Sequence, residues 1–400
     1  MSFGIAFDID GVLFQAGAGA YVPLPGARDV LLALNEPAPP HRITVPHVYL
    51  TNGTGTTEAG KAEQLRKTLN LPFELPPHQV VLASSPLCEL PAIWAASRRP
   101  DGTAATATSS IPSAGSEHDE DKKKKKQPRV LVLSHSHDNA VMLARSSGFT
   151  NIATVQEFLQ KYPFLVPVKG KAPGATSATL TTDELAARQK ALELEEPFHS
   201  VLLYQSPEDW ESALQICTDV LRSRDGRIAG RHNDLLPNEP QFVELHSGNP
   251  DFDYGALHAT PRITLGAFRR CLEMVFLEST GRTLVSSLYG KPYPSVYDYA
   301  RRLLEAQAAD IAQRSASEGG ATPAGASSGD ARIARVYAVG DNPLSDIKGA
   351  NTAGWHSILV RTGCFTGPGN HDEHPATHVC HGVKEALDWI LSQERAQTQQ

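Results

Sequence analysis

The sequence predicts an α/β protein whose core is a parallel β-sheet. Five short apolar runs have the length and composition of buried strands, at residues 3–7, 47–50, 130–133, 200–204 and 335–339. Each run is followed by a turn and then by apolar residues at helical spacing, which is the alternation that a parallel sheet requires. Polar residues come directly after several of these runs, at the edge where open α/β sheets bind ligands.

The helices are predicted from apolar residues that recur on one helical face. After residues 130–133 these are Ala140, Leu143 and Ala144. After residues 200–204 they are Trp210, Ala213, Leu214, Cys217 and Leu221. A later helix, predicted to start near Pro294, has the apolar face Val296, Tyr299, Ala300, Leu303 and Leu304.

Three segments do not fit a buried core. Residues 97–127 and 308–330 are dominated by small and polar residues, so both are predicted to be disordered surface insertions. Residues 171–196 are a further predicted insertion, partly helical from Thr182 onward. The lysine run 122–126 favours a solvated linker, with a nuclear signal or a contact to an anionic surface as alternatives.

Composition narrows the class of protein. The chain has 400 residues, enough for two domains, and its formal net charge of -7 argues against a nucleic-acid-binding protein. Its five cysteines are scattered without paired spacing, which indicates reduced intracellular thiols rather than a disulfide framework or a zinc site. No apolar stretch approaches the roughly 18 residues of a membrane helix, and no signal or transit peptide is visible at the N-terminus. We therefore expect an intracellular protein without an integral membrane segment.

The most informative motif is Phe7-Asp8-Ile9-Asp10-Gly11, at the end of the first predicted strand. Side chains two positions apart on a strand point the same way, so Asp8 and Asp10 would place two like charges side by side. A divalent metal resolves this repulsion, and an Asp beside a metal can attack phosphorus as a nucleophile. The alternative is an Asp-rich strand end that caps a turn, with Gly11 supplying the turn conformation.

Two further segments present groups that suit an anion. Thr51, which precedes Asn52 and Gly53, would offer its hydroxyl beside backbone N–H groups, although Thr is also a common helix N-cap. Lys291 is held in an extended conformation by Pro292, which aims its ammonium at the same edge. There it could neutralise a nucleophile and a phosphate oxygen, whereas most lysines are merely solvated.

A final strand end adds two carboxylates, Asp341 and Asp346, across a turn that contains Pro343. Asp341 is placed to bind a hard cation such as Mg²⁺, and Asp346 could bind directly or orient a coordinated water. N-capping by Asp341 or Asn342 is the alternative, and it explains only one of the two carboxylates.

Taken in order, Asp-x-Asp, Thr, Lys-Pro and Gly-Asp-x₄-Asp resemble the four motifs of the haloacid dehalogenase superfamily. The resemblance implies a Rossmann-like, doubly wound parallel sheet. It also implies that Asp8 is the nucleophile that forms an aspartyl-phosphate and that Asp10 is the general acid and base.

The resemblance assigns the other site residues as well. The implied phosphate-binding residues are Thr51, Asn52, Gly53 and Lys291, of which Lys291 also counts as catalytic. The implied Mg²⁺ ligands are Asp8, Asp10 through its backbone carbonyl, Asp341 and, in support, Asp346.

Roughly 240 residues separate Thr51 from Lys291, far more than one helix and strand require. In this superfamily a long insertion at that place is a cap domain. Segments such as Pro25-Gly26-Ala27 and Tyr289-Gly290-Lys291-Pro292 are similar to class IIA, the 4-nitrophenylphosphatase branch with an α/β cap. Segments 206–210, 249–251 and 265–269 are similar to its cat-eye-syndrome-critical-region-5 type, also called haloacid dehalogenase-like hydrolase domain-containing 5.

The implied domains are a core at residues 1–88, a cap at 89–262 and the rest of the core at 263–395.

The sequence departs from the class IIA branch after Gly53, where the usual further Asn/Ser pair is missing, so substrate choice stays open. Family members are often assigned to mitochondria and linked to glycerophospholipid metabolism, and their caps often form homodimers. Cytoplasm is the alternative location.

Asp10 favours a phosphatase, because a phosphatase needs an acid that protonates the leaving group, and a dehalogenase does not. A transport ATPase would need membrane helices, and a phosphomutase usually has a smaller cap nearer the nucleophile. We therefore expect a Mg²⁺-dependent phosphoric monoester hydrolase that acts on a small phosphorylated metabolite. The competing hypothesis is a catalytically weak scaffold or binding protein.

Two cap segments could be mistaken for sites. The His-rich segment 134–138 is interpreted as a polar loop and helix cap rather than a metal site. Asp251 is a candidate specificity residue, because the branch presents cap residues to the active site, and a proline-turn role is the alternative.

Overall fold

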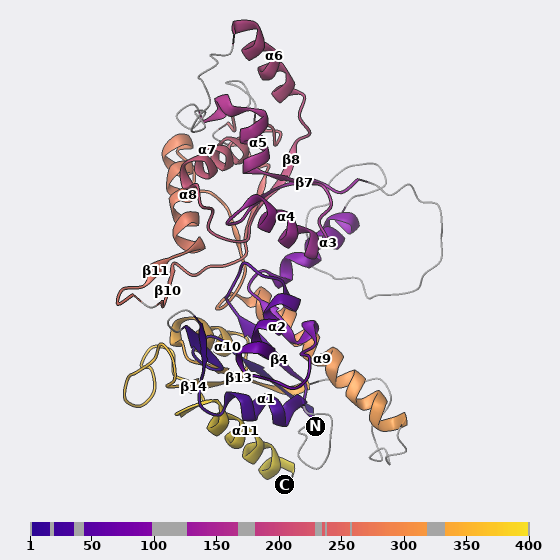
Figure 1. The fold of residues 1–400 in the computed structure, drawn as a ribbon, viewed down its shortest axis with the longest axis vertical. Helices are drawn as coiled ribbons and strands as arrows, with labels where there is room; N and C mark the ends of the chain where they lie inside the picture. Colours follow the sequence, from indigo (N-terminus) through magenta and orange to yellow (C-terminus); the bar gives the residue numbers. More distant parts are fainter. Residues whose placement is uncertain are drawn as a thin grey trace. The chain divides into compact units, whose positions relative to one another are not determined.

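The computed structural model describes residues 2–16, 20–35, 44–97, 126–166, 181–228, 234–236, 238–256, 258–317 and 333–398. The chain forms two compact units, and each has its own parallel sheet (Figure 1). The first unit consists of Met1–Ser85, Tyr254–Arg262 and Tyr289–Gln400. The second consists of Pro86–Asp253 and Ile263–Leu288.

The first unit contains a six-stranded sheet in which every pairing is parallel. From edge to edge its strands are β15 (His378–Cys380), β14 (His356–Val360), β13 (Ile333–Gly340), β1 (Ser2–Phe7), β4 (His47–Thr51) and β5 (Val80–Leu82). Because β1 lies between β4 and β13, successive strands are added outward from it in both directions. The carboxyl end of β1 is therefore the topological switch point, where open α/β sheets bind ligands.

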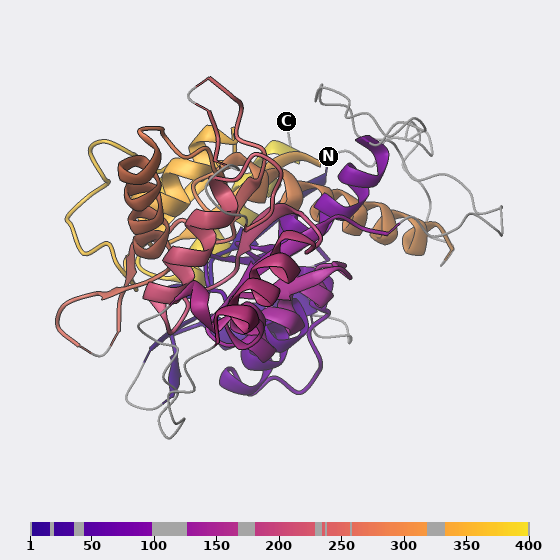
Figure 2. The same cartoon turned by 90° about the horizontal axis from the view of Figure 1, so that it is seen from above.

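Helices cover both faces of this sheet. Alternation along β1 directs Ile5 and Phe7 to one face and Ala6 to the other. The first face packs against α1 (Ala27–Asn35), α2 (Glu58–Thr68) and α11 (Val383–Thr398). The second packs against α9 (Pro294–Ser317) and α10 (Lys348–Thr352). The C-terminal part of α9, beyond the buried Ala308, projects past the sheet in both views (Figures 1 and 2).

The second unit contains a five-stranded parallel sheet with a separate apolar core. Its strands, from edge to edge, are β12 (Ser287–Leu288), β9 (Glu244–Ser247), β8 (Phe198–Leu203), β6 (Arg129–Leu133) and β7 (Ile152–Thr154). Its helices are α3 (Leu90–Ser97), α4 (His137–Ser146), α5 (Val155–Lys161), α6 (Thr182–Glu193), α7 (Trp210–Leu221) and α8 (Leu265–Thr280). The core is built mainly from α5, α7 and α8 against the sheet.

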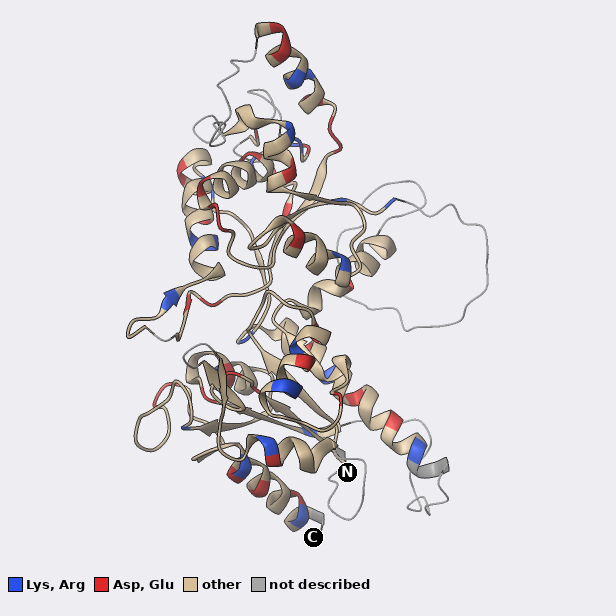
Figure 3. Cartoon of the chain, viewed as in Figure 1, with Lys and Arg blue, Asp and Glu red and all other residues tan. Residues whose placement is uncertain are grey.

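The remaining described elements are short. They are the strand pairs β2 (Phe14–Ala16) with β3 (Tyr21–Pro23) and β10 (Asp253–Tyr254) with β11 (Arg262–Ile263), and the turns η1 (Pro77–Gln79), η2 (Ser85–Glu89), η3 (Pro163–Leu165) and η4 (Pro343–Ile347). Acidic and basic residues are interspersed along the helices of each unit (Figure 3). No described helix is both long enough and apolar enough to cross a lipid bilayer.

The predicted α/β class and all five predicted strands are confirmed, and the strands divide between the two sheets. The unit boundaries differ from the expected domains at three places. Residues 86–88, expected in the core, belong to the second unit, and residues 254–262, expected in the cap, belong to the first. The largest difference is at residues 263–288, which were expected in the core with the first unit. The structure packs them in the second, because Phe268, Leu272 and Phe276 of α8 are buried in its core.

The predicted insertions are described only in part. Residues 308–317 are not disordered as expected, since they continue helix α9, and Ala308 is buried. Helix α6 confirms the expected helix from Thr182 onward. The parts of the predicted insertions at 98–125, 171–180 and 318–330 lie outside the described residues.

Candidate active site

The candidate site begins where β1 ends. The Asp8 N–H donates to the Val339 carbonyl at 2.8 Å, so Asp8 still continues the pairing with β13. The chain then turns at Gly11, whose φ of 81° is a conformation that glycine adopts most easily. Asp8 is consequently buried at the sheet edge, whereas Asp10 is exposed.

Three buried carboxylates meet at this edge. One oxygen each of Asp8, Asp341 and Asp346 lies within 4.8 Å of the others. Asp341 directly follows β13, and Asp346 belongs to the π-helical turn η4. The backbone N–H groups of Asp341 and Asn342 donate to Asp346 Oδ2, at 3.2 and 3.0 Å, and the Cys364 N–H donates to Asp341 Oδ2 at 2.6 Å. The capping role considered for Asn342 is present, because its side chain accepts from the Leu344 N–H.

Lys291 lies among these carboxylates, although it is far from all of them in sequence. Its Nζ is 2.7 Å from Asp8 Oδ1 and 2.6 Å from Asp346 Oδ1, and it donates to the Leu50 carbonyl at 3.3 Å. The Asn52 side chain holds the Lys291 backbone from both sides: its Nδ2 donates to the Lys291 carbonyl and its Oδ1 accepts from the Lys291 N–H. Asn52 therefore positions the backbone of Lys291.

The electrostatics of the cluster favour a cation. Burial, together with the negative charges of Asp346 and Asp341, raises the pKa of Asp8 well above its usual range despite Lys291. Burial and Asp346 raise the pKa of Asp341 to about 6. Burial alone would lower the pKa of Lys291, but Asp346 and Asp8 outweigh it and raise that pKa. Three carboxylates and one ammonium leave two negative charges, which matches a divalent cation with oxygen ligands.

Asp10 has different surroundings. Its Oδ2 accepts a hydrogen bond from the Thr51 hydroxyl at 3.2 Å, and the same hydroxyl accepts from the Gly53 N–H at 2.8 Å. Thr57, not Thr51, caps helix α2, so the capping alternative for Thr51 is wrong. The Asp10 side chain is not part of the carboxylate cluster found among the described residues. The two acids of the Asp-x-Asp motif are thus separated, one buried beside Lys291 and one exposed beside Thr51.

Two glycines pack directly against the Asp341 carboxylate. A methyl group added at Gly363 would lie 2.0 Å from Asp341 Oδ2, and one added at Gly11 would lie 2.4 Å from the same atom. No side chain fits at either position without displacing Asp341. The sequence interpretation missed Gly363 and the Cys364 N–H, because the loop after β14 carries no recognisable pattern.

A second missed residue is Lys61, which is buried in α2 near Thr51. The sequence could have indicated that Lys61 is buried, because it lies next to Ala62 and four residues before Leu65, and both of these face the core. A lysine on the buried part of a helix is unusual unless it has an anionic partner.

The cap segments have structural partners. Ser136 caps α4, and the His137 ring is hydrogen-bonded to Thr154, in line with the predicted polar loop and helix cap. The Asp251 N–H donates to the Asn249 side chain, and its carbonyl accepts from the Gly266 N–H.

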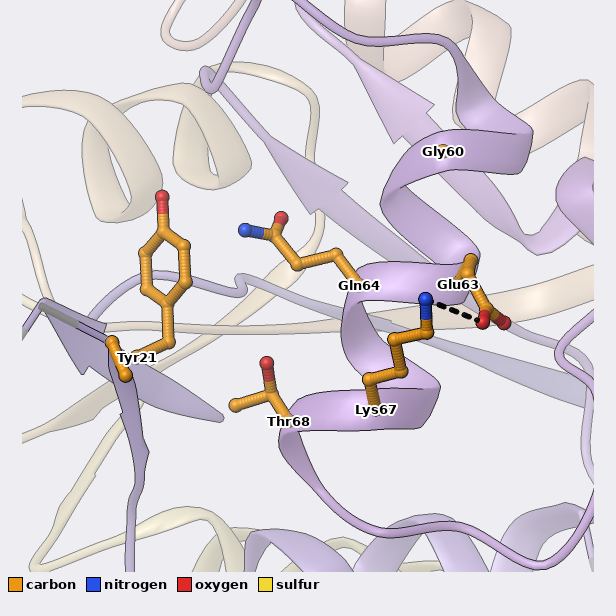
Figure 4. A pocket seen from close by; sticks show the side chains of 7 residues that line it. Tyr21, Gly60, Glu63, Gln64, Lys67 and Thr68 are labelled. Atoms are coloured by element: carbon orange, nitrogen blue, oxygen red, sulfur yellow. Dashed lines mark ion pairs between the residues drawn. The ribbon is translucent and has the colours of Figure 1, made fainter.

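A separate pocket lies between Tyr21 of β3 and helix α2 (Figure 4). It is lined by Tyr21 of β3 and by Gln64, Thr68 and the ion-paired Glu63 and Lys67 of α2, with Lys67 Nζ 3.2 Å from Glu63 Oε1. None of the motif residues lines it, so it is not the candidate active site.

Two family models match the chain. The model for haloacid dehalogenase-like hydrolases matches residues 5–150, and a second, described as HAD-hydrolase-like, matches residues 288–386. A mitochondrial hydrolase of Saccharomyces cerevisiae is 26% identical over 96% of this chain and 94% of its own length. A cardiolipin synthase (CMP-forming)/mitochondrial hydrolase fusion protein of Schizosaccharomyces pombe is 29% identical over 97% of this chain. The chain spans 53% of that fusion protein.

Solved structures share the fold. A hypothetical protein of Pyrococcus horikoshii matches 98% of this chain and 100% of its own, at 16% identity and a TM-score of 0.57. The glycerol phosphate phosphatase of Mycobacterium tuberculosis in complex with magnesium matches 95% of this chain and 75% of its own, at 15% identity and a TM-score of 0.51.

Proposed function

We propose that the chain is a haloacid dehalogenase-like hydrolase, which the family models matched to residues 5–150 and 288–386 support, and that it acts as a Mg²⁺-dependent phosphatase on a small phosphoric monoester. The observation that carries the proposal is the position of Asp8. This carboxylate is buried beside Lys291 and two further carboxylates, while Asp10 is held apart by Thr51. A nucleophile and a proton donor in different surroundings are what phosphoryl transfer through an enzyme carboxylate requires.

In the proposed first half-reaction, a carboxylate oxygen of Asp8 attacks phosphorus. The ester P–O bond breaks while Asp10 gives its proton to the leaving oxygen. In the second half-reaction, Asp10 removes a proton from water, and the water oxygen attacks phosphorus. The bond between Asp8 and phosphorus breaks, so that orthophosphate leaves and the Asp8 carboxylate is restored. Lys291, in contact with Asp8, favours the ionised form of the nucleophile and can neutralise a phosphoryl oxygen, while Thr51 offers its hydroxyl.

The three clustered carboxylates fit a divalent cation, because their oxygens are close together, buried and only partly neutralised by Lys291. We assign Asp8, Asp341 and Asp346 as the side chains that would hold Mg²⁺, together with the Asp10 backbone carbonyl. Bound Mg²⁺ would supply charge neutralisation at the phosphoryl oxygens.

Further parts of the proposal rest on the relatives and on the resemblance. The chain is proposed to belong to class IIA and its cat-eye-syndrome-critical-region-5 type, with the second unit as the cap, Asp251 as a specificity residue and the cap as a homodimer contact. Two relatives are named as mitochondrial hydrolases, which supports a mitochondrial location. The similarity to a protein in which such a hydrolase is fused to a cardiolipin synthase supports a link to glycerophospholipid metabolism.

Turnover of 4-nitrophenyl phosphate with Mg²⁺ tests the proposed function. We expect Asp8→Asn to lower kcat by at least about three orders of magnitude, because the nucleophile is lost. Asp29→Asn, an exposed position in α1, serves as the matched control and should retain native activity. Equal rates for the native chain and Asp8→Asn would exclude the proposed mechanism and favour the scaffold hypothesis.

A further inference from the structure

Two buried lysines flank the candidate site, and the proposed mechanism uses only one of them. Among the described residues, Lys61 and Lys291 are the only buried lysines, with exposed fractions of 5% and 4%. Lys61 belongs to α2, which packs on one face of the sheet, and Lys291 lies three residues before α9, which packs on the other face. Lys291 contacts the carboxylate of Asp8 directly.

The Lys61 ammonium lies near Asp10 instead. A methyl group added at Gly53 would be 3.5 Å from Lys61 Nζ, 3.1 Å from Thr51 Oγ1 and 3.8 Å from Asp10 Oδ2. These three polar atoms therefore surround one small space. A side chain at residue 53 would occupy this space and crowd Thr51 Oγ1.

The two lysines also differ in their partners. Lys291 has two carboxylates within ion-pair distance, whereas Lys61 has none among the described residues, and no side-chain hydrogen bond of Lys61 is formed there. Its Nζ lies 5.9 Å from the centre of the Phe14 ring. Burial lowers the pKa of Lys61, although Asp10 and Asp8 act in the opposite direction. A buried ammonium without a paired anion is costly, so an anion that enters this space would be bound favourably.

The position of Lys61 indicates which part of a substrate it would meet. Under the proposed function, Asp8 attacks phosphorus beside Lys291, and Asp10 protonates the leaving oxygen. An anion held by Lys61 next to Asp10 therefore belongs to the leaving group. One ammonium balances one negative charge, which a carboxylate carries.

We propose that Lys61 is a specificity-determining residue that binds a carboxylate on the leaving group, close to the ester oxygen of the substrate. The inference rests on the proposed function and names its substrate class, the phosphoric monoesters of small hydroxy acids. Gly53 contributes by leaving room for the carboxylate between Lys61 and Thr51.

Binding of two matched ligands tests this inference without turnover. Phosphoglycolate and ethyl phosphate share one skeleton, and a methyl group in the second replaces the carboxylate of the first. Affinities are measured by calorimetry with Mg²⁺ present, in the full chain carrying Asp8→Asn. We expect phosphoglycolate to bind at least about tenfold more tightly than ethyl phosphate, because one charge-assisted hydrogen bond contributes a free energy of that size.

Adding Lys61→Met should reduce this ratio of affinities to about one, and Lys61→Arg should restore most of it. Lys67→Met, at an exposed position of the same helix, is the matched control and should leave the ratio unchanged. A general loss of folding or phosphate binding cancels in the ratio, so a merely structural role would not change it.

The inference is overturned if the native ratio is already close to one, or if Lys61→Met weakens both ligands equally. Turnover of 4-nitrophenyl phosphate separates this failure from failure of the proposed function. A chain that hydrolyses that ester but shows no carboxylate preference remains a phosphatase without the proposed specificity. A chain that neither hydrolyses it nor binds either ligand overturns both proposals.

Discussion

At the residue level, Asp8 and Asp10 have the same chemistry but different neighbours. Asp8 is buried between Lys291 and two carboxylates, so its charge depends on cations. Asp10 is exposed and is held by the Thr51 hydroxyl. The burial of one and exposure of the other suit a nucleophile and a proton carrier, respectively.

The close contact of Gly363 with Asp341 leads to a prediction at this scale. Gly363→Ala should raise the Mg²⁺ concentration needed for half-maximal activity by about tenfold or more, because the new methyl group would overlap Asp341 Oδ2. Calorimetric titration of Mg²⁺ measures the same loss directly.

Gly255→Ala is the matched control, since a methyl group at Gly255 meets open space. Unchanged Mg²⁺ affinity in Gly363→Ala would mean that Asp341 does not hold the metal.

At the level of elements, the periodic pattern was enough to locate the strands that carry the site. β1, β4 and β13 all coincide with predicted apolar runs, and Asp8, Thr51 and Asp341 lie at their ends. Parallel strands bring their carboxyl ends to one edge, which is why residues this far apart could be grouped from sequence. The apolar pattern does not show which polar side chain of a helix lies near the strand ends. For this reason the sequence did not indicate that Lys61 of α2 lies beside the candidate site.

An ion-pair network in the second unit joins β6, α5 and the segment before β8. The Glu195 carboxylate contacts Lys161, accepts from the Tyr162 hydroxyl at 2.7 Å and pairs with Arg129 at 2.8 Å. Burial raises the pKa of Glu195, but these hydrogen bonds outweigh it and lower the pKa to about 2. The pKa of Glu195 in the folded chain lies below its ordinary value of 4.5. The ionised Glu195 therefore stabilises the fold fully above pH 4.5, and this stabilisation is lost as the pH falls towards 2.

Glu195→Gln should therefore lower the free energy of unfolding by about 1–2 kcal/mol at pH 7, and by much less near pH 3. Urea unfolding at pH 7, 5, 4 and 3 measures the difference from the native chain. Glu193→Gln, at an exposed position of α6, provides the baseline. An equal penalty at pH 7 and pH 3 would contradict the ionic origin of this stabilisation.

At the level of the whole molecule, the described chain has two sheets with separate cores. The first unit is assembled from three segments of the chain, and every residue proposed for catalysis belongs to it. A ligand of the carboxylate cluster should therefore stabilise the first unit directly.

Amide hydrogen exchange should show this effect. Mg²⁺ at about 100 times its Kd stabilises the state that binds it by about 2.7 kcal/mol. Peptides from residues 3–13 and 335–347 should exchange more slowly, while those from residues 200–221 should not change. The protection should disappear in Asp341→Asn, and equal protection of both units would contradict a metal site confined to the first.

The amino-acid order was sufficient to predict the α/β class, the strands and the four segments that meet at the candidate site. These features depend on local burial and on turn residues, which leave a periodic trace in the sequence. Long-range packing settled the rest: that Lys291 contacts Asp8, that Asn52 holds the Lys291 backbone, that residues 263–288 join the second unit, and that Lys61 lies beside Gly53. Such contacts join residues that are distant along the chain, so the periodicity of one sequence contains no record of them.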